Sequence, residues 1–159
     1  NSKMKFDNKG LLAKSGKLNE IILKKFFNNS YYKKKFPKSL DVKDFNLSDL
    51  NKIDLEDGCA TLSMLTVMSI CMAIRSFDED PNTILFSGGG RKNKFIIDNI
   101  KKIIKKQIYL IDEFNFNGDF IESQTFAYLA IRSYLKKFIT LPGVTGVKQF
   151  CLGGSVFKN

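Results

Sequence analysis

The sequence predicts an α/β domain with parallel strands, and two observations lead to this class. Two short apolar runs, residues 83–86 and 108–111, alternate with longer segments in which apolar residues recur at helical spacing. Three consecutive glycines follow the first run and separate it from the next helical segment. Alternation of this kind is typical of a central parallel sheet flanked by helices. The length of 159 residues indicates one domain, large enough to bury a core without a disulfide or a metal.

The first 58 residues are polar and weakly patterned. Residues 7–10 carry a turn signal, and the apolar spacing of residues 18–27 predicts a helix. Pro37 should end any structure begun before it, because proline lacks an amide donor and constrains its predecessor. Asn46 or Ser48 is suited to cap a short helix.

The pattern is sharper from Cys59 onward. Residues 59–74 are apolar nearly all round a helix, which predicts burial on most sides. They include serine and threonine at intervals, and no run approaches the roughly 18 uncharged apolar residues of a membrane span. After an expected loop at residues 78–81, the uniformly apolar run 83–86 is typical of a central strand buried on both faces.

The second half repeats this alternation. We expect an amphipathic helix over residues 95–104, a second strand at 108–111 and a further helix over 120–135 with one apolar side. A final strand is expected over residues 150–157, although Gly153 and Gly154 interrupt it.

The net charge of +10 is compatible with a nucleic-acid or membrane-surface partner. However, only Arg75, Arg91 and Arg132 are arginines, whereas proteins that read nucleic acid favour arginine for bidentate contacts. The excess of lysine therefore indicates coding bias in an AT-rich genome. Residues 31–35 interleave tyrosines with lysines, so a basic module that binds nucleic acid stays open as the alternative function.

The three cysteines are scattered, and the sequence contains no histidine. A zinc site and a serine–histidine–aspartate triad are therefore not expected. We interpret the cysteines as reduced core residues. Together with the lack of a secretory signal pattern at the first residues, this predicts a cytoplasmic setting.

The glycine turn is the first candidate site. Gly88, Gly89 and Gly90 allow the backbone to approach a ligand closely, and Asn93 can cap the next helix or touch a nucleotide. The spacing matches neither a Walker motif nor the dinucleotide-binding fingerprint. From spacing alone, a ligand site and a tight strand-to-helix turn remain equal alternatives.

Acidic residues give the second candidate. Asp119 and Glu122 flank the start of the predicted helix at 120–135, where Glu122 is suited to bind a hydroxylated substrate. The helix dipole alone also favours acids at this position. A third segment, residues 141–146, is interpreted as a surface loop.

Short motifs in a fixed order run from about residue 6 to residue 153. They are Pro37-Lys38-Ser39, Phe45-Asn46, Ala60-Thr61-Leu62, Leu65-Thr66, Ser69-Ile70, Gly88-Gly89-Gly90 with Asn93, Gly118-Asp119 with Glu122, Phe126-Ala127 with Leu129-Ala130, Leu141-Pro142 with Val144-Thr145-Gly146, and Leu152-Gly153. The ordered set resembles the anhydro-N-acetylmuramic acid kinase family. Ser123 and Tyr128 depart from it, standing where alanine and tryptophan are usual.

The resemblance implies the C-terminal lobe of a two-lobed actin, hexokinase and sugar-kinase (ribonuclease H-like) fold. It implies ATP and Mg²⁺, with Gly88, Gly89, Gly90 and Asn93 at the cofactor and Glu122 at the sugar. The implied reaction opens 1,6-anhydro-N-acetylmuramic acid with water and phosphorylates its 6-hydroxyl, in bacterial peptidoglycan recycling. The implied homodimer is a further expectation.

The resemblance also predicts which parts of the enzyme this chain does not contain. The family's G-T-S-x-D-G phosphate loop and D-T-G-P base motif do not occur in the sequence. We therefore expect the catalytic base in an N-terminal lobe outside this chain, with residues 1–58 connecting the lobes and 59–159 forming the nucleotide-facing lobe. Because phosphoryl transfer depends on groups from both lobes to position the reactants, the chain alone is expected to be inactive.

Overall fold

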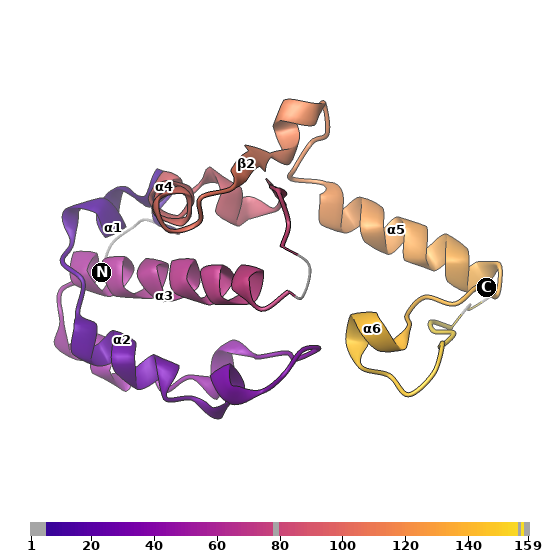
Figure 1. Ribbon diagram of the computed structural model, residues 1–159, viewed down its shortest axis with the longest axis horizontal. Coiled ribbons are helices and arrows are strands. Elements are labelled where there is room, and N and C mark those ends of the chain that lie inside the picture. Colours follow the sequence, from indigo (N-terminus) through magenta and orange to yellow (C-terminus); the bar gives the residue numbers. More distant parts are fainter. Residues whose placement is uncertain (1–5, 78–79, 156, 158–159) are drawn as a thin grey trace.

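A computed structural model describes residues 6–77, 80–155 and 157. The fold is α/β, as expected, with a small parallel sheet and packed helices (Figure 1). Its helices and strands are α1 (Leu11–Ser15), α2 (Glu20–Phe27), α3 (Leu55–Arg75), β1 (Thr83–Phe86), α4 (Lys94–Ile103), β2 (Gln107–Leu110), α5 (Ile121–Tyr134) and α6 (Pro142–Thr145). Short 3-10 helices are η1 (Asn8–Gly10), η2 (Ser30–Lys33), η3 (Val42–Asp44), η4 (Ser48–Lys52), η5 (Gly89–Lys92) and η6 (Ile111–Phe114).

The sheet consists of β1 and β2, which pair in parallel with Thr83 opposite Gln107 and Phe86 opposite Leu110. Both strands were expected from the sequence and are confirmed within one residue. Helix α4 connects them, because parallel neighbours need a crossover rather than a hairpin. Ile84 and Phe86 of β1 face the core formed with α3 and α4.

The main core lies between α3, α4 and the sheet. Val67 and Cys71 of α3 pack with Ile100 and Ile104 at α4 and with Ile108 of β2. Ile100 is 0% exposed and lies at the centre of the apolar side that the sequence of α4 predicts. Burial of such a side chain stabilises the fold by about 1.5–3 kcal/mol relative to its exposure.

A second, smaller core joins the N-terminal segment to α3. Ile22, Leu23 and Phe26 of α2 pack against Leu65. The Asn19 side chain caps α2 by accepting a hydrogen bond from the Ile22 amide at 3.0 Å. The helix expected at residues 18–27 is thus confirmed, and its burial explains why this polar segment is ordered.

Other turn signals are also explained locally. Asn46 Oδ1 accepts a hydrogen bond from the Ser48 amide at 3.0 Å, where η4 begins. Residues 78 and 79 of the expected loop at 78–81 lie outside the described residues.

Burial of α3 on most sides was expected, and this prediction is wrong. Leu62, Met68 and Met72 are exposed, while the buried stripe faces α1, α2, α4 and the sheet. By length and composition alone α3 could cross a membrane, a test that packed core helices also meet. Helix α3 contacts α1, α2 and α4, as a core helix does, but the described residues leave one of its apolar stripes uncovered.

The outer face of the sheet is similarly open. Leu85 of β1 is 50% exposed, so the prediction of a strand covered on both faces is wrong for the described chain. Helices α3 and α4 cover the face that carries Ile84 and Phe86, and the described residues provide no matching cover for Leu85.

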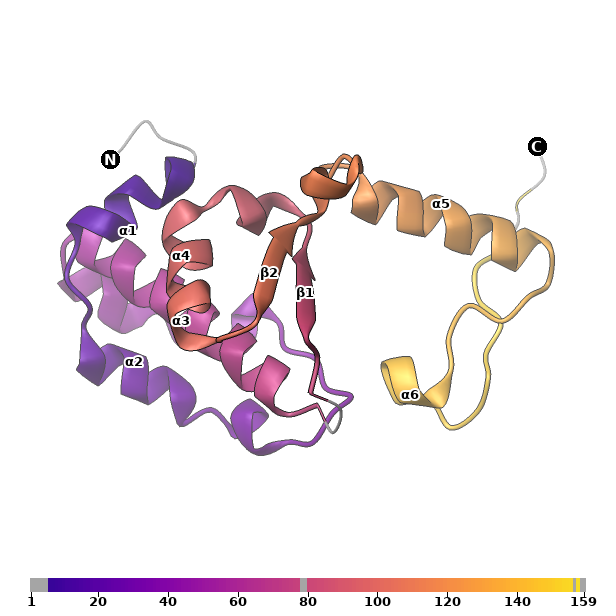
Figure 2. The ribbon, with the colours of Figure 1, turned by 45° about the horizontal axis from the view of Figure 1, so that its top comes forward.

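The expected helix at residues 120–135 is confirmed as α5, but none of its residues is buried. It leads away from the body formed by α1 to α4 and the sheet, and the chain then turns back so that α6 lies between the far end of α5 and that body (Figures 1 and 2). Phe126 and Tyr134 are 65% and 69% exposed. The apolar side that the sequence predicts is therefore present but unpaired with the described part of the chain.

The final strand expected at residues 150–157 is wrong. Over the described residues of this segment, Cys151 forms only an isolated antiparallel bridge with Thr140. Gly154 has a φ of 78°, in the left-handed region, which is incompatible with a continuing strand. The carbonyl of Gly153 accepts a hydrogen bond from the Ser133 hydroxyl, which holds this segment against the end of α5.

Substitution of Ile100 by alanine tests the position of the main core. Removing its buried side chain should lower the free energy of unfolding by about 2–5 kcal/mol, because a cavity remains in a packed interior. Urea unfolding followed by far-ultraviolet circular dichroism measures the change. Lys101→Ala is the matched control, since Lys101 is the exposed neighbour, and should change stability by about 0.5 kcal/mol or less. Equal losses in the two variants would contradict this core.

Candidate nucleotide-facing site

The candidate site lies at the carboxyl edge of the parallel sheet, where β1 runs into the glycine turn and β2 runs into η6. In open α/β sheets, ligands bind outside this edge. A depression of about 430 Å³ opens there, lined by Arg91, Lys92, Leu110, Asp112 and Glu113.

The glycine turn has an open outer side. A Cβ atom built on Gly88, Gly89 or Gly90 would meet no atom within 4 Å. Gly88 has a φ of 76° and requires glycine for its backbone conformation. Gly89 and Gly90 are exposed and face open space. Gly88 is thus explained by its backbone conformation, contact with the described chain explains neither Gly89 nor Gly90, and a ligand at the turn stays a prediction.

Arg91 is the central residue of this edge and is only 6% exposed. Its Nε and Nη2 donate to the two oxygens of Asp112 at 2.6 and 2.8 Å. Its Nη1 donates to Asp119 Oδ1 at 2.7 Å and to the Gly88 carbonyl at 2.9 Å. Lys92 Nζ donates to the second oxygen of Asp119 at 2.5 Å. We call this set of contacts around the guanidinium the Arg91 junction.

The Arg91 side chain can occupy its position only because residue 118 is a glycine. A Cβ at this position would lie 2.3 Å from Arg91 Nε and 2.5 Å from Cζ. The Gly118 carbonyl accepts from the Gly88 amide at 3.1 Å, and its amide donates to Asp112 Oδ1 at 3.3 Å. The segment that begins α5 is thereby bonded directly to the glycine turn.

The ion pairs fix the charge state of the Arg91 junction. The hydrogen-bonded guanidinium of Arg91 holds the pKa of Asp112 well below its ordinary value. Lys92 first, and then Arg91, lower the pKa of Asp119. The two carboxylates in turn raise the pKa of Arg91. All three groups are therefore charged at neutral pH, and together with Lys92 the two cations balance the two carboxylates.

The sequence placed two polar residues at this site, and they have different surroundings. Asn93 Oδ1 caps α4 by accepting from the Ile96 amide at 3.2 Å, and it lies against the backbone of Gly10. Its contact with a cofactor stays a prediction. Glu122 is exposed in the first turn of α5, three residues after Asp119. Both acids are exposed, but Asp119 is held in ion pairs with Arg91 and Lys92, whereas the described residues form no ion pair with Glu122.

Sequence reasoning missed Arg91. The available signal was an arginine directly after the glycines in a chain whose basic residues are nearly all lysines. Planar, bidentate pairing with a carboxylate is a reason for arginine in particular at such a position.

Fold and site together define a class: a sugar-kinase-like α/β lobe, with a glycine turn at the carboxyl edge of its parallel sheet. The family model described as anhydro-N-acetylmuramic acid kinase matches residues 1–159. The chain belongs to the anhydro-N-acetylmuramic acid kinase family, which confirms the resemblance inferred from its motifs.

Curated relatives agree with this assignment. The anhydro-N-acetylmuramic acid kinase of Pelagibacter ubique is 42% identical over 167 residues, covering 99% of this chain and 44% of the relative. Proteins of the same name from Zymomonas mobilis and Caulobacter vibrioides are each 33% identical, over 95% and 96% of this chain and 41% of each relative. The chain thus spans about two fifths of the length of these bacterial relatives.

A double-mutant cycle tests the contact between Gly118 and Arg91. Gly118→Ala should destabilise the fold by about 1–3 kcal/mol, because the new methyl group overlaps the guanidinium. In an Arg91→Ala background the same change should cost about 0.5 kcal/mol or less, since the overlapping group is gone. Gly89→Ala is the control, because a Cβ at Gly89 meets open space. Additive losses, measured by urea unfolding, would contradict the contact.

Acid should weaken the Arg91 junction. Folding lowers the pKa of Asp112. The stabilisation from its ion pair with Arg91 is therefore fully present above the unfolded pKa of about 3.9, and it is lost as the pH falls through the folded-state pKa. The Tm difference between the wild type and Asp112→Asn should be constant from about pH 7 to about pH 5 and shrink toward about pH 2. Asp98→Asn, which removes an exposed pair with Lys94, is the control. A difference that grows in acid would contradict the ion pairing.

Proposed function

We propose that this chain is the ATP-facing, C-terminal part of a cytoplasmic kinase of peptidoglycan recycling. The proposed reaction uses water to open the anhydro ring of 1,6-anhydro-N-acetylmuramic acid and ATP to phosphorylate its 6-hydroxyl. The observation that carries the proposal is the glycine turn, whose open backbone lies at the carboxyl edge of the sheet in a member of this kinase family. The relatives' shared name supplies the activity and the sugar.

The turn fits a nucleotide by its shape. Gly88, Gly89 and Gly90 leave free the space that side chains would fill, so a phosphate or ribose can approach the backbone closely. The Gly88 amide already donates to Gly118, so the proposed donors to the ligand are the amides of Gly89 and Gly90. ATP would supply the phosphoryl group that is transferred. Asn93 remains the proposed fourth contact, through the part of its amide that does not cap α4.

Mg²⁺ is proposed to accompany ATP in the complete enzyme. We assign it no ligand in this chain. The carboxylates nearest the turn, Asp112 and Asp119, are already bound by Arg91 and Lys92. Their role in the proposal is to hold the turn rather than the metal.

Glu122 is the proposed sugar contact. An exposed carboxylate can accept hydrogen bonds from the hydroxyl or amide groups of an amino sugar, and such charge-assisted bonds are stronger than neutral ones. The Arg91 junction ties the start of α5 to the glycine turn, which supports a sugar contact at Glu122 near the proposed nucleotide contacts.

The catalytic base and the main phosphate loop are proposed to lie in a complementary N-terminal lobe, in cis or in trans. In this scheme residues 1–58 connect the lobes and residues 59–159 form the nucleotide-facing lobe. The uncovered apolar surface of α5, with Phe126, Ile131 and Tyr134, supports a partner at this position. Homodimerisation is a further proposal, and the chain alone is proposed to be inactive.

A chimera tests the function. The 159-residue chain replaces the matching segment of the Pelagibacter ubique relative, which is 42% identical. Transfer of the γ-phosphate to anhydro-N-acetylmuramic acid is then measured for the chimera and for the chain alone. We expect activity in the chimera only. Glu122→Gln should lower kcat/KM for the sugar by about 10- to 100-fold, and Gly89→Val should raise KM for ATP by about tenfold or more.

The control is Glu20→Gln, at an exposed position on α2, which should leave kcat/KM for the sugar and KM for ATP unchanged. Two results would contradict parts of this proposal. Unchanged sugar kinetics in Glu122→Gln would remove Glu122 from the site. Turnover by the isolated chain would refute the proposed requirement for a second lobe.

A further inference from the structure

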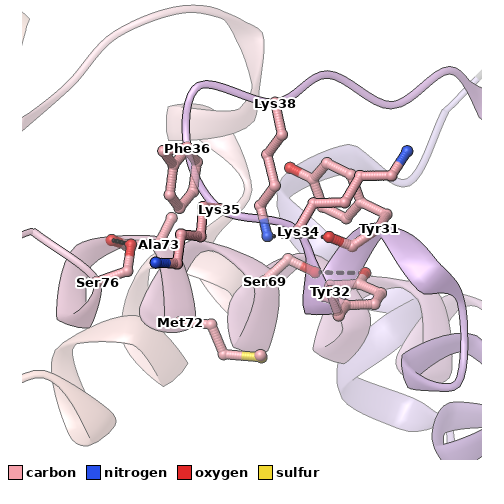
Figure 3. A pocket seen from close by; sticks show the side chains of 10 residues that line it. All are labelled: Tyr31, Tyr32, Lys34, Lys35, Phe36, Lys38, Ser69, Met72, Ala73 and Ser76. Carbon is pink, nitrogen blue, oxygen red and sulfur yellow. Dashed lines mark hydrogen bonds between the residues drawn. The ribbon is translucent and has the colours of Figure 1, made fainter. Parts of the chain in front are cut away.

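A second hollow lies away from the glycine turn, between the segment after α2 and the C-terminal half of α3 (Figure 3). Its volume is about 540 Å³, a size suited to a small molecule. Its walls carry three lysines, three aromatic rings and two serine hydroxyls, and among the described residues that line it none is acidic. The lining residues are Tyr31, Tyr32, Lys34, Lys35, Phe36, Lys38, Ser69, Met72, Ala73 and Ser76.

One cation of this hollow is held in place. Lys38 Nζ donates to the Tyr31 carbonyl at 3.1 Å and lies 4.4 and 4.8 Å from the ring centres of Tyr31 and Phe36. Figure 3 shows its ammonium directed toward α3. A cation fixed by the protein itself loses less conformational entropy when it binds an anion.

Other donors surround the same space. Tyr32 Oη and Ser69 Oγ lie 2.9 Å apart on the α3 side, and one of these hydroxyls remains free to donate outward. The Lys35 ammonium reaches toward Ala73 and Ser76, whereas that of Lys34 points away beside Tyr31 (Figure 3). Two ammonium groups and a hydroxyl pair therefore border the hollow.

We propose that this hollow binds the phosphoryl group of a small ligand, either inorganic phosphate or a phosphate ester. Two cations and hydroxyl donors around one space suit a divalent, oxygen-rich anion. The cations come from one short segment and border a bounded hollow, not an extended track, which disfavours a nucleic-acid strand. The site is separate from the glycine turn and does not rest on the proposed kinase function. It gives a role to the aromatic and basic residues 31–35 that the kinase proposal leaves unused.

Isothermal titration of the complete 159-residue chain tests the site. The probes are inorganic phosphate, pyrophosphate and a hexose 6-phosphate. We expect saturable binding of at least one of them. Lys35→Gln and Lys38→Gln should each weaken it by about tenfold or more, because each removes a charge-assisted contact. Lys33→Gln carries the same charge change on an exposed neighbour outside the lining, and should leave the affinity within about twofold.

Each result is decisive for the site. Lys35 is exposed, so Lys35→Gln keeps the test valid even if Lys38→Gln disturbs the fold. Tighter binding of the hexose 6-phosphate than of inorganic phosphate supports an ester as the ligand, and equal binding supports the free ion. The proposal would be overturned if none of the three probes bound saturably, or if Lys33→Gln weakened binding as much as the two lining variants. It would also be overturned if bound pyrophosphate were displaced by a single-stranded oligonucleotide but not by phosphate or the hexose 6-phosphate.

Discussion

The guanidinium of Arg91 is the interaction on which the C-terminal half of the structure depends. Helix α5 has no buried residue, so apolar packing within the described chain does not fix its start. Arg91 instead bonds the carbonyl of the glycine turn, Asp112 after β2 and Asp119 before α5. Because Arg91 is buried while its partners are charged, loss of either carboxylate would leave a poorly compensated cation. The position of Glu122, the proposed sugar contact, thus depends on the ion pairs and hydrogen bonds of Arg91 rather than on apolar packing.

The N-terminal half is held together differently. Helix α3 forms a common wall of the two cores, with Val67 and Cys71 facing the sheet side and Leu65 facing α2. Other apolar side chains of α3, among them Met68 and Met72, are exposed, as is Leu85 of the sheet. These uncovered surfaces have the composition of interior elements, which fits a chain that spans about two fifths of its relatives. The proposed complementary lobe would cover these surfaces.

Sequence reasoning worked best where a local signal decides the outcome. Strand β1 and helices α2, α4 and α5 follow from their hydrophobic period, and α4 also from its capping residue Asn93. It failed at residues 150–157, because the left-handed φ of Gly154 and the attachment of Gly153 to Ser133 overrode an apolar pattern. It also missed Arg91, whose partners are 21 and 28 residues away in the sequence. Pairing over such distances has no periodic signature.

By itself, the sequence determined the α/β class, the order of the main elements, the place of the glycine turn and the family. These properties reside in local periodicity, backbone requirements and motif order, all of which can be read along the chain. Only the tertiary structure decided that the outer side of the turn is open and that Gly118 makes room for Arg91. It also decided that Asp119 is held in ion pairs by Arg91 and Lys92, since this outcome depends on which distant residues share the same space.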